Sequence, residues 1–540
     1  MTGTTGTTPE SAVQPGLPTG FVPFPADRAA AYRAAGYWTG RRVDSVLRTA
    51  AENWPARTAV VDATGEHSYA DLDALADGAA VHVTAMGIAP GERVLLQLPN
   101  SRRFPVALCG LLRAGAIPVM CLPGHRLAEL SHFAEVSGAV ALVIAETGGG
   151  FDYRAMAEQL VATHPLRIIT DTDLCAESAT GAAPSIEVDP AAPALLLVSG
   201  GTTGPPKLIP RTHDDYVYNF TASAELCGLA GDDVYLVSLP AAHNFPLACP
   251  GILGAMTVGA TIVFGTDHSP ESAFATIVKH GVTVTALVPA LAKLWAQACE
   301  WESVRPTTLR LLQVGGAKLV PGDARLIRGA LTPGLQQVFG MAEGLLNYTR
   351  LGDPTDIVDN TQGRPLSAHD ELRVVDESGC DVPPGDEGEL LVRGPYTLNG
   401  YFNAERDTER SFSPDGFYRT GDRVRRFENG YLEVTGRVKD VIHRGGETVS
   451  ALDLEEHLLT HPAIWSAAAV PVHDEHLGEK ICAAVVFTGP AITLAELNTH
   501  LDERGVAAHA RPDVLAPMTA LPTTAVGKVD KKAIAQQIAG

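Results

Sequence analysis

An apolar stretch that runs directly into a glycine- and hydroxyl-rich loop constrains this chain more than any other feature. Residues 195–198 are Leu-Leu-Leu-Val, and residues 199–207 are Ser-Gly-Gly-Thr-Thr-Gly-Pro-Pro-Lys. Glycine adopts backbone conformations closed to other residues, so backbone N–H groups and hydroxyls in such a loop can approach phosphate oxygens. Lys207 can neutralise the charge of those oxygens. The segment therefore predicts a phosphate-binding turn at the end of a buried strand.

The loop differs from the Walker A pattern of P-loop NTPases, which requires Gly-Lys followed by Ser or Thr. Here Pro206 precedes the lysine and Leu208 follows it. A P-loop NTPase is therefore disfavoured. For three of the loop residues taken alone, an ordinary Gly/Thr turn with a surface lysine is the alternative.

Helical patterns alternate with short β-rich runs along the first part of the chain. Residues 70–86 have a helical pattern, whereas 93–98 and 141–144 are dominated by aliphatic residues. This alternation predicts βαβ units and a largely parallel sheet. The pattern recurs between residues 195 and 339, so we expect an α/β protein with two βα-layered sheets.

After residue 365 the predicted strands, such as 371–375 and 389–392, become shorter and closer together. Gly and Asp turns separate them, which is typical of a small antiparallel lobe. A polar segment follows, and Ser450 with Asp453 three residues later predicts a helix start. We place a domain boundary before this helix. The expected divisions are a flexible leader (1–19), a large N-terminal domain (20–438) and a smaller α+β C-terminal domain (439–540).

The composition excludes several classes of protein. At 45% hydrophobic residues the chain is too apolar to be disordered, and its 41 basic against 62 acidic residues leave a net charge of −21. That balance disfavours a general role in binding nucleic acid or anionic membranes. We expect no membrane span and no secretion signal, because no run of about 18 apolar residues occurs. The 8 scattered cysteines lack a CxxC pair and are typical of reduced thiols in a cytoplasmic protein.

Five further motifs follow the loop. They are Gly315-Gly316-Ala317-Lys318, Phe339-Gly340-Met341-Ala342-Glu343, Tyr418-Arg419-Thr420-Gly421-Asp422, Gly436-Arg437-Val438-Lys439-Asp440 and Thr523-Thr524-Ala525-Val526-Gly527-Lys528. Together with the loop, this series resembles the adenylate-forming enzymes, which include acyl-CoA synthetases, luciferases and the adenylation domains of nonribosomal peptide synthesis. Segments 207–216, 242–247 and 340–351 are similar to the stand-alone aryl acid ligases of siderophore and peptide pathways, whose best-known members activate 2,3-dihydroxybenzoate or salicylate.

The resemblance implies ATP and Mg²⁺ as cofactors and a nucleotide site built from the motifs. Such enzymes join a carboxylate to the α-phosphorus of ATP, so cationic groups and N–H donors must bring two anions together. The residues implied to hold the β- and γ-phosphates are Ser199, Thr202, Thr203 and Lys207. Glu343 would hold Mg²⁺, and Asp422, assisted by Arg437, would accept hydrogen bonds from the ribose. The other implied nucleotide contacts are Gly200, Gly201, Gly204, Gly315, Gly316, Ala317, Phe339, Gly340 and Met341.

Lys528 completes the implied catalytic set with Lys207 and Glu343. It would bridge the substrate carboxylate and the α-phosphate. Without the resemblance, Lys528 and its neighbours Lys531 and Lys532 could equally form a solvated basic patch. The family's C-terminal domain is mobile, and Lys439 matches the hinge about which it rotates before the acyl group passes to a thiol. The implied acceptor is the phosphopantetheine of a separate aryl carrier protein, although free coenzyme A has the same arm.

The residues implied to line the acyl pocket are His243, Asn244, Phe245, Cys249, Gly315 and Leu346. Asn244 stands where many amino-acid-activating domains carry Asp, which argues for an acid without an α-amine. Relatives that activate 2,3-dihydroxybenzoate tend to have Ser and Val at the positions of Cys249 and Leu346, whereas salicylate activators tend to have Cys and Leu. A thiol is a weak partner for a 3-hydroxyl, and the larger Leu346 fills the space that a missing hydroxyl leaves. His243 is expected to be a wall or gate without a proton-transfer role.

The sequence therefore predicts an enzyme: a cytoplasmic aryl acid-AMP ligase that activates salicylate or a substituted analogue. The alternatives are a 2,3-dihydroxybenzoate-AMP ligase, a benzoate-type acyl-CoA synthetase, and a catalytically silent protein that binds nucleotide or aryl acid. The presence of Lys207, Glu343, Asp422, Arg437 and Lys528 together argues against the silent binder.

Overall fold

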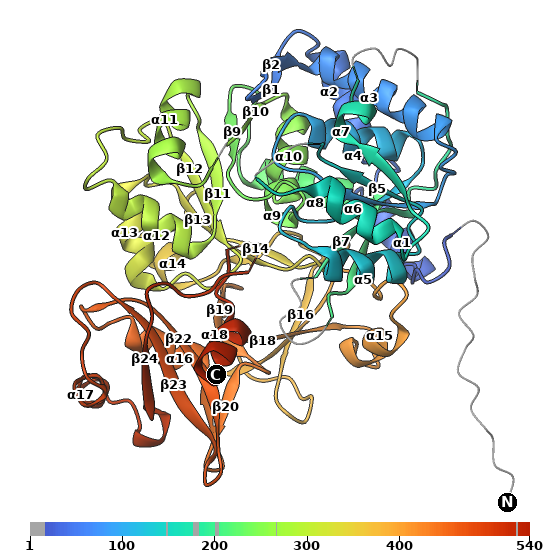
Figure 1. Ribbon diagram of the computed structural model, residues 1–540. Coiled ribbons are helices and arrows are strands. Elements are labelled where there is room, and N and C mark those ends of the chain that lie inside the picture. The colour runs from blue at the N-terminus through green and yellow to red at the C-terminus, as the bar shows by residue number, and fades with distance from the viewer. Residues whose placement is uncertain are drawn as a thin grey trace, which may run out of the picture.

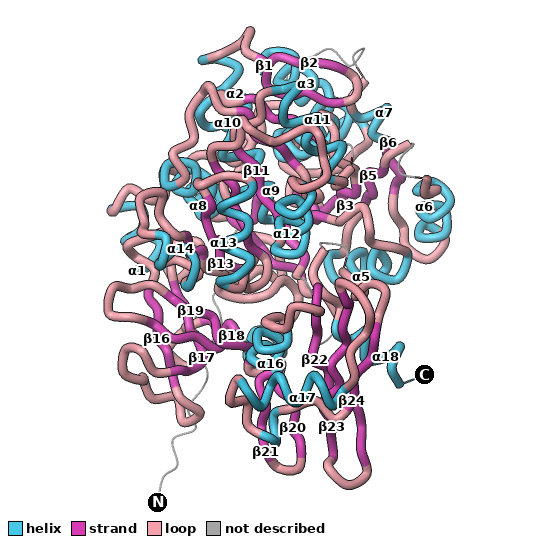
Figure 2. Tube along the Cα trace, turned by 90° about the vertical axis from the view of Figure 1, so that its left-hand side faces the viewer, coloured by secondary structure: helices cyan, strands magenta, loops and turns pink. Residues whose placement is uncertain are grey.

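The computed structural model describes residues 17–146, 150–176, 183–199, 205–265, 267–524 and 527–539. Strands within these ranges form sheets of six, nine, four and five strands. The two larger sheets and their helices occupy the upper part of Figure 1, and the C-terminal unit, coloured orange to red, lies below them. Figure 2, turned by 90°, shows the same division. The predicted α/β class, with a large N-terminal part and a smaller C-terminal part, is confirmed.

The six-stranded sheet is parallel except for one edge strand. The glycine-rich loop connects that strand to its neighbour in the sheet. The four-residue strands β4 and β5 are buried throughout, as expected where helices cover both faces of a parallel sheet. In spatial order the strands are β6 (Arg167–Thr170), β5 (Ala141–Ile144), β3 (Arg93–Gln97), β4 (Ile117–Met120), β7 (Pro193–Val198) and β8 (Leu208–Thr212). The helices along this part of the chain are α1 (Ala26–Ala34), α2 (Ser45–Asn53), α3 (Tyr69–Ala85), α4 (Arg103–Arg113), α5 (Leu127–Ser137), α6 (Tyr153–Val161) and α7 (Asp171–Leu174).

The nine-stranded sheet has a parallel centre and antiparallel edges. Its order is β15 (Arg364–Pro365), β14 (Leu346–Tyr348), β13 (Leu335–Gly340), β12 (Leu311–Gly315), β11 (Val284–Leu287), β9 (Val234–Val237), β10 (Thr261–Phe264), β1 (Thr58–Asp62) and β2 (Gly65–Ser68). The accompanying helices are α8 (His213–Leu226), α9 (Asn244–Ala248), α10 (Gly251–Val258), α11 (Pro270–His280), α12 (Pro289–Ala298), α13 (Pro321–Ala330) and α14 (Thr355–Asn360). Alternate residues of a strand face opposite sides, so Tyr235 of β9 joins the main core and Leu236 joins the outer core under α11 and α12.

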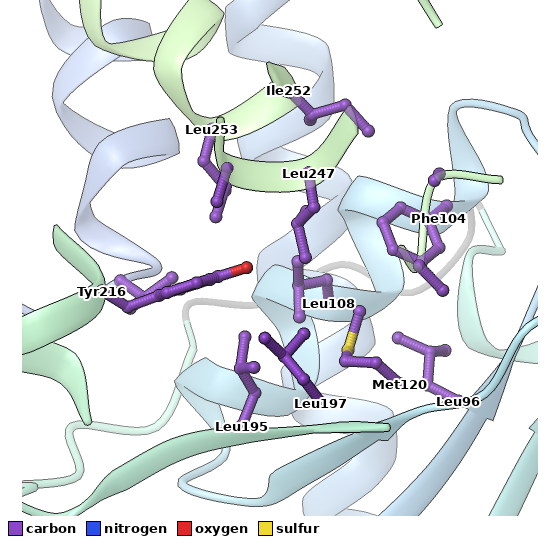
Figure 3. Close-up of a cluster of buried hydrophobic side chains, with 14 of the residues drawn as sticks. Leu96, Phe104, Leu108, Met120, Leu195, Leu197, Tyr216, Leu247, Ile252 and Leu253 are labelled. Carbon is purple, nitrogen blue, oxygen red and sulfur yellow. The ribbon is translucent and has the colours of Figure 1, made fainter. Parts of the chain in front are cut away.

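One hydrophobic core joins the two large sheets. Figure 3 shows part of it, where leucines of β7 lie beneath Leu108 of α4 and Leu247 of α9. Leu195, Leu197 and Leu247 are at most 2% exposed. This packing holds the segment 243–249 over β7, the strand that precedes the glycine-rich loop in the sequence.

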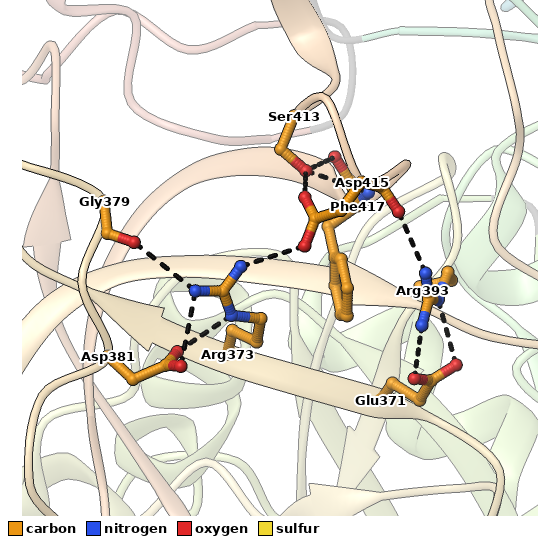
Figure 4. A network of polar contacts seen from close by, with 8 residues as sticks. All are labelled: Glu371, Arg373, Gly379, Asp381, Arg393, Ser413, Asp415 and Phe417. Carbon is orange, nitrogen blue, oxygen red and sulfur yellow. Dashed lines mark hydrogen bonds and ion pairs between the residues drawn. The ribbon is translucent and has the colours of Figure 1, made fainter.

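The small antiparallel lobe comprises β16 (Glu371–Val375), β17 (Glu387–Arg393), β18 (Tyr418–Arg426) and β19 (Leu432–Arg437), with α15 (Glu405–Ser411) between β17 and β18. On one face the Phe417 ring lies between two guanidinium groups, 5.7 Å from that of Arg373 and 4.2 Å from that of Arg393 (Figure 4). Glu371 and Asp381 pair with these arginines. Strands β18 and β19 of this lobe carry Asp422 and Arg437, which are predicted to contact the nucleotide.

The C-terminal unit is built on a long hairpin. Its elements are β20 (Val441–Arg444), β21 (Glu447–Ser450), α16 (Ala451–Leu458), β22 (Ile464–Asp474), β23 (Gly478–Phe487), α17 (Leu494–Glu503), a 3₁₀ helix (Ala508–Ala510), β24 (Val514–Pro517) and α18 (Lys531–Ala539). Ser450 Oγ accepts a hydrogen bond from the Asp453 N–H, which confirms the predicted helix start. A separate core that includes Ile442, Leu454 and Leu497 stabilises this unit.

Several strands were not expected from the sequence, among them β18 and β22. Strand β22 contains Ser466-Ala467-Ala468-Ala469, whose intrinsic preference is helical, and pairing with β23 overrides it. All 8 cysteines are free, as predicted, and five of them are buried. Within the described residues, no helix is both long and apolar enough to cross a membrane.

A glycine between α14 and β15 makes a close approach that the fold requires. Gly363 has φ +85°, and a Cβ atom there would lie 2.1 Å from the Tyr348 carbonyl carbon. Gly430 has a similar φ of +82°, but a Cβ atom there would meet nothing within 4 Å.

Gly363→Ala should therefore lower the free energy of unfolding by about 2–5 kcal/mol, through backbone strain and a clash. Gly430→Ala, the matched control, should cost only about 1–2 kcal/mol from strain alone. Thermal unfolding of both variants beside the parent protein measures the difference. Equal midpoint shifts would show that the contact with Tyr348 has no energetic role.

Candidate active site

The ends of the glycine-rich loop are fixed by the strands on either side of it. Lys207 N–H donates to Ser199 Oγ at 2.8 Å, and Ser199 N–H donates to the Lys207 carbonyl at 2.9 Å. The Lys207 Nζ atom lies 4.6 Å from the centroid of the Tyr401 ring and 3.5 Å from Asp407 Oδ1. The predicted phosphate contacts Gly200, Gly201, Thr202, Thr203 and Gly204 lie outside the described residues.

Glu343 lies near the same tyrosine. Tyr401 donates from its hydroxyl to Glu343 Oε1 at 3.1 Å, and it also lies 2.9 Å from the Tyr418 hydroxyl. Burial raises the pKa of Glu343, and the charges of Arg437 and Lys207 oppose that rise. A buried carboxylate that is poorly compensated by protein charge would be stabilised by a bound cation.

Asp422 and Arg437 face each other across the β18–β19 ladder. The Arg437 Nε atom donates to Asp422 Oδ1 at 2.8 Å. The Asp422 carboxylate raises the pKa of Arg437, so this guanidinium stays charged. The pair thus offers a carboxylate acceptor and a cation, and both charges affect the pKa of Lys528.

The small residues expected beside the adenine lie at the carboxyl ends of β12 and β13. A Cβ atom on Gly315 would lie 2.5 Å from the Val338 carbonyl oxygen and 3.2 Å from Phe245 Cζ. Gly316 has φ +89°. Gly316 and Ala317 follow the end of β12, whereas Phe339 and Gly340 end β13 and Met341 follows them. Ligands of open α/β sheets bind at this edge, where strands end.

The predicted acyl-pocket residues are brought together around α9. Tyr216 donates from its hydroxyl to Asn244 Oδ1 at 2.8 Å, and Asn244 Nδ2 donates to Cys249 Sγ at 3.6 Å. Both Cys249 and Leu346 are at most 2% exposed. Leu346 lies on β14 against Gly340, since a Cβ atom on that glycine would be 2.5 Å from Leu346 Cδ2.

Sequence reasoning missed two functional neighbours, Tyr216 and Arg211. Arg211 is 1% exposed and pairs with Asp215 at 2.8 Å. It also donates to the Ala342 carbonyl at 3.2 Å, next to Glu343. The available sequence signal for Arg211 was its position four residues before Asp215, a spacing that supports an ion pair within a helix. Arg211 lies on β8 rather than on that helix, so its role as a buried link could not be read from the spacing.

Lys528, near the C-terminal end of the chain, lies close to other residues of this site. A Cβ atom on Gly316 would lie 3.3 Å from Lys528 Cε. Burial lowers the pKa of Lys528, and the charge of Arg437 lowers it further, against the opposing effect of Asp422 and Glu343. Its loop is closed by Thr524 N–H, which donates to the Lys528 carbonyl at 2.7 Å.

His243, predicted to be a wall or gate, is the residue that precedes α9. Its Nδ1 atom accepts from the Phe245 N–H at 3.3 Å. Burial, together with the charge of Lys528, lowers the pKa of His243 to about 3. The imidazole is therefore neutral near pH 7.

A mostly apolar cleft of about 410 Å³ lies beside the lysine loop. Core residues and two residues of the loop line it, among them Leu239, Pro240, Val288, Leu291, Thr524 and Gly527. Lys439, the predicted hinge residue, is exposed and lies between β19 and β20.

Comparison with known families agrees with this arrangement. The AMP-binding enzyme family matches residues 47–402, and the C-terminal domain of AMP-binding enzymes matches residues 453–528. The chain therefore belongs to the AMP-binding enzymes, and the predicted resemblance to adenylate-forming enzymes is confirmed.

Comparison with individual relatives indicates the subgroup of AMP-binding enzymes to which the chain belongs. Salicyl-AMP ligase / salicyl-S-ArCP synthetase of Mycobacterium tuberculosis is 68% identical over 535 residues, which cover 96% of this chain and 94% of the relative. The 2,3-dihydroxybenzoate-AMP ligase of Bacillus subtilis is 44% identical over 530 residues, covering 96% and 98%. The apo structure of MbtA from Mycobacterium smegmatis is 70% identical, with a TM-score of 0.75 and coverage of 96% and 99%. The predicted subgroup of aryl acid ligases is thus confirmed.

The lowered pKa of Lys528 is directly measurable. Because burial disfavours its charged form, this amine should lose its proton at a lower pH than an ordinary lysine. Competitive labelling with acetic anhydride across a pH series, with mass spectrometry of the peptide, should give a labelling midpoint below that of N-acetyl-lysine in the same mixture. A midpoint at or above this standard would contradict the partly buried position.

Proposed function

We propose that this enzyme uses ATP to convert salicylate, or a close analogue, to its acyl-adenylate and then transfers the aryl group to a carrier-protein thiol. The observation that carries the proposal is the meeting of Lys528 with the Gly315–Gly316 edge, beside Glu343, Asp422 and Arg437. The relative at 68% identity, a salicyl-AMP ligase, supports salicylate as the acid.

In the first half-reaction, a carboxylate oxygen forms a bond to the α-phosphorus while the bond from phosphorus to pyrophosphate breaks. Lys528 would contact both the substrate carboxylate and the α-phosphate, where its charge favours their approach. Lys207 would hold the outer phosphates with Ser199 and the loop that follows it. Asp422 would accept hydrogen bonds from the ribose hydroxyls, with Arg437 beside it. Such preorganised charge acts most strongly where negative charge grows in the transition state.

Glu343 fits the expected Mg²⁺, since it is a carboxylate whose pKa is raised by burial and whose neutralisation by protein groups is incomplete. Among the described residues no group of three or more His, Cys, Asp and Glu could hold a metal. A single protein carboxylate is what Mg²⁺ needs when nucleotide phosphates and water supply its other oxygens. When bound, the ion would neutralise phosphate charge.

The neutral imidazole of His243 supports its expected role as a wall. An uncharged ring beside Lys528 adds no further positive charge to the cleft and has no proton to give near pH 7. We therefore assign His243 to separating the acyl and nucleotide sides, and no proton transfer to it.

The acyl pocket has a defined polarity. Because Tyr216 donates to the Oδ1 atom of Asn244 and one amide N–H donates to Cys249 Sγ, the amide has its second N–H to offer to a ring 2-hydroxyl or carboxylate. Gly315 and Phe245 would form one side of the ring site, and Leu346 the end. In this pocket Cys249 has only a weak hydrogen-bonding group, which suits salicylate better than a 3-hydroxylated ring.

In the second half-reaction, the thiol sulfur would attack the acyl carbon and AMP would leave. We propose the phosphopantetheine of an aryl carrier protein as the thiol, because the relative at 68% identity is named a salicyl-S-ArCP synthetase. We further propose that residues 439–540 rotate as a domain about Lys439 between the two steps, and that both steps occur in the cytoplasm. A comparison of an aryl carrier domain with free coenzyme A distinguishes this proposal from a benzoate-type acyl-CoA synthetase.

Exchange of labelled pyrophosphate into ATP tests the first step. We expect the highest kcat/KM with salicylate, lower values with 2,3-dihydroxybenzoate, and much lower values with benzoate and anthranilate. Lys528→Ala should reduce exchange by about 10²-fold or more while ATP binding persists, because one preorganised charge is worth several kcal/mol at the transition state. Absence of exchange with all four acids would overturn the proposal, and a preference for 2,3-dihydroxybenzoate would favour the alternative ligase.

Cys249→Ser tests the basis of selectivity. A serine hydroxyl can pair with a 3-hydroxyl, whereas an unpaired buried hydroxyl costs about 1–3 kcal/mol, so the kcat/KM ratio should shift toward 2,3-dihydroxybenzoate by roughly tenfold. Cys482→Ser, a buried thiol of the C-terminal unit, is the matched control and should leave the ratio unchanged. A shift toward salicylate in Cys249→Ser would remove this residue from the pocket.

A further inference from the structure

A pair of charges lies where helix α16 of the C-terminal unit meets the large N-terminal part. Lys318 directly follows Gly315-Gly316-Ala317, and its Nζ atom lies 2.6 Å from Glu456 Oε1 of α16. The Lys318 side chain is 7% exposed. We propose that Lys318 and Glu456 are positioning residues, a latch that seats Lys528 for the adenylation step. The inference rests on the proposed function.

The latch joins two separate parts of the molecule. On its other side, Lys318 Nζ lies 3.8 Å from Glu433 Oε1 of β19, which belongs to the small lobe. Opposite charges attract more strongly at 2.6 Å than at 3.8 Å, and more strongly where water is largely excluded. Glu456 is therefore the stronger partner, and its attraction is present only while α16 is docked.

The position of α16 determines the position of Lys528 through a second charged group. Lys531, three residues after Lys528, lies 2.8 Å from Glu455 Oε1 and 2.7 Å from Asp440 Oδ2. Glu455 also accepts the Ala469 N–H at 2.7 Å, which fixes it within the C-terminal unit. Neighbouring carboxylates on α16 thus hold the lysine loop on one side and the N-terminal part on the other.

The contacts connect Lys318, α16 and Lys528 to one another. Gly316, two residues before Lys318, is the glycine whose Cβ atom would lie 3.3 Å from Lys528 Cε. A segment of three residues therefore contacts both the catalytic lysine and, through Lys318, the helix to which the loop of that lysine is tied. Loss of the pair at Glu456 would leave Lys528 attached to its own unit but less firmly placed against Gly316.

A second lysine supports the docked arrangement. Lys293 of α12 donates to the Trp465 carbonyl at 3.2 Å, and its Nζ atom lies 5.3 Å from the centroid of the Trp465 ring. Leu452 of α16 also packs against the main core. The rest of this interface can keep the C-terminal unit folded and near the site when the latch is removed.

A charge exchange tests the proposal. Glu456→Lys and Lys318→Glu should each lower salicylate-dependent pyrophosphate exchange by roughly tenfold, since each places like charges together. The double variant Lys318→Glu/Glu456→Lys should recover most of that loss. Glu433→Gln, the matched control, should change exchange by less than about twofold, as expected for a weaker and more distant partner.

The transfer step separates positioning from general damage. Transfer of the salicyl group from preformed salicyl-adenylate to a carrier-protein thiol should be undiminished in Glu456→Lys, and thermal unfolding of that variant should match the parent. Equal losses in exchange and transfer, additive losses in the double variant, or a loss in Glu433→Gln as large as in Glu456→Lys would overturn the latch. If Lys318→Glu does not fold, the exchange and transfer rates of Glu456→Lys and Glu456→Gln still decide. Absence of exchange in the parent protein would instead refute the proposed function.

Discussion

The site depends on a close approach between segments that few residues other than glycine would allow. At the carboxyl edge of the nine-stranded sheet, Gly315 lies against Val338 and Phe245, Gly340 lies against Leu346, and Gly316 lies against Lys528. A side chain at Gly315 or Gly340 would collide with backbone or with the acyl-pocket wall. These contacts bring residues predicted for the acyl pocket, residues predicted for the nucleotide site and Lys528 to one place. The positions of the other functional groups follow from that meeting.

Burial changes the pKa values of two charged groups of the candidate site in opposite directions. It raises the pKa of Glu343 and lowers that of Lys528, since water is withdrawn from both. Neither charge is fully compensated by the protein alone. A polyanionic nucleotide with a bound divalent cation would supply what each lacks. The intact ion pairs, such as Arg437 with Asp422 and Arg211 with Asp215, provide a fixed frame around these two groups.

Much of the fold was predictable because its signals are local. Strands β5 and β16 begin and end at the predicted residues, and both ends of helix α3 are within one residue of the expected bounds. Strand β22 was not predictable, since only its pairing with β23 overcomes the helical preference of its alanines. Strand β18 was hidden by its arginines, which pair with acidic residues of β17 and β19 on the exposed face.

The candidate site was likewise predictable only in part. Ordered motifs identified Glu343, Asp422, Arg437 and Lys528, whose proximity is now visible. Tyr216 and Arg211 were missed because their importance lies in partners distant in sequence, Asn244 and Ala342. A hydrogen bond between remote residues leaves no periodic signal in a single sequence. The glycines and threonines at 200–204 remain a prediction, as do the individual roles assigned to the site residues.

The short connection between β19 and β20 has a mechanical consequence. Val438 N–H donates to the Gly421 carbonyl of the small lobe at 2.8 Å, whereas Asp440 is held by Lys531 of the C-terminal unit at 2.7 Å. Lys439 alone stands between an anchor on one body and an anchor on the other. A rotation of the C-terminal unit would therefore be concentrated in the backbone torsions next to Lys439. A small change in these torsions would move the distant lysine loop over a large distance.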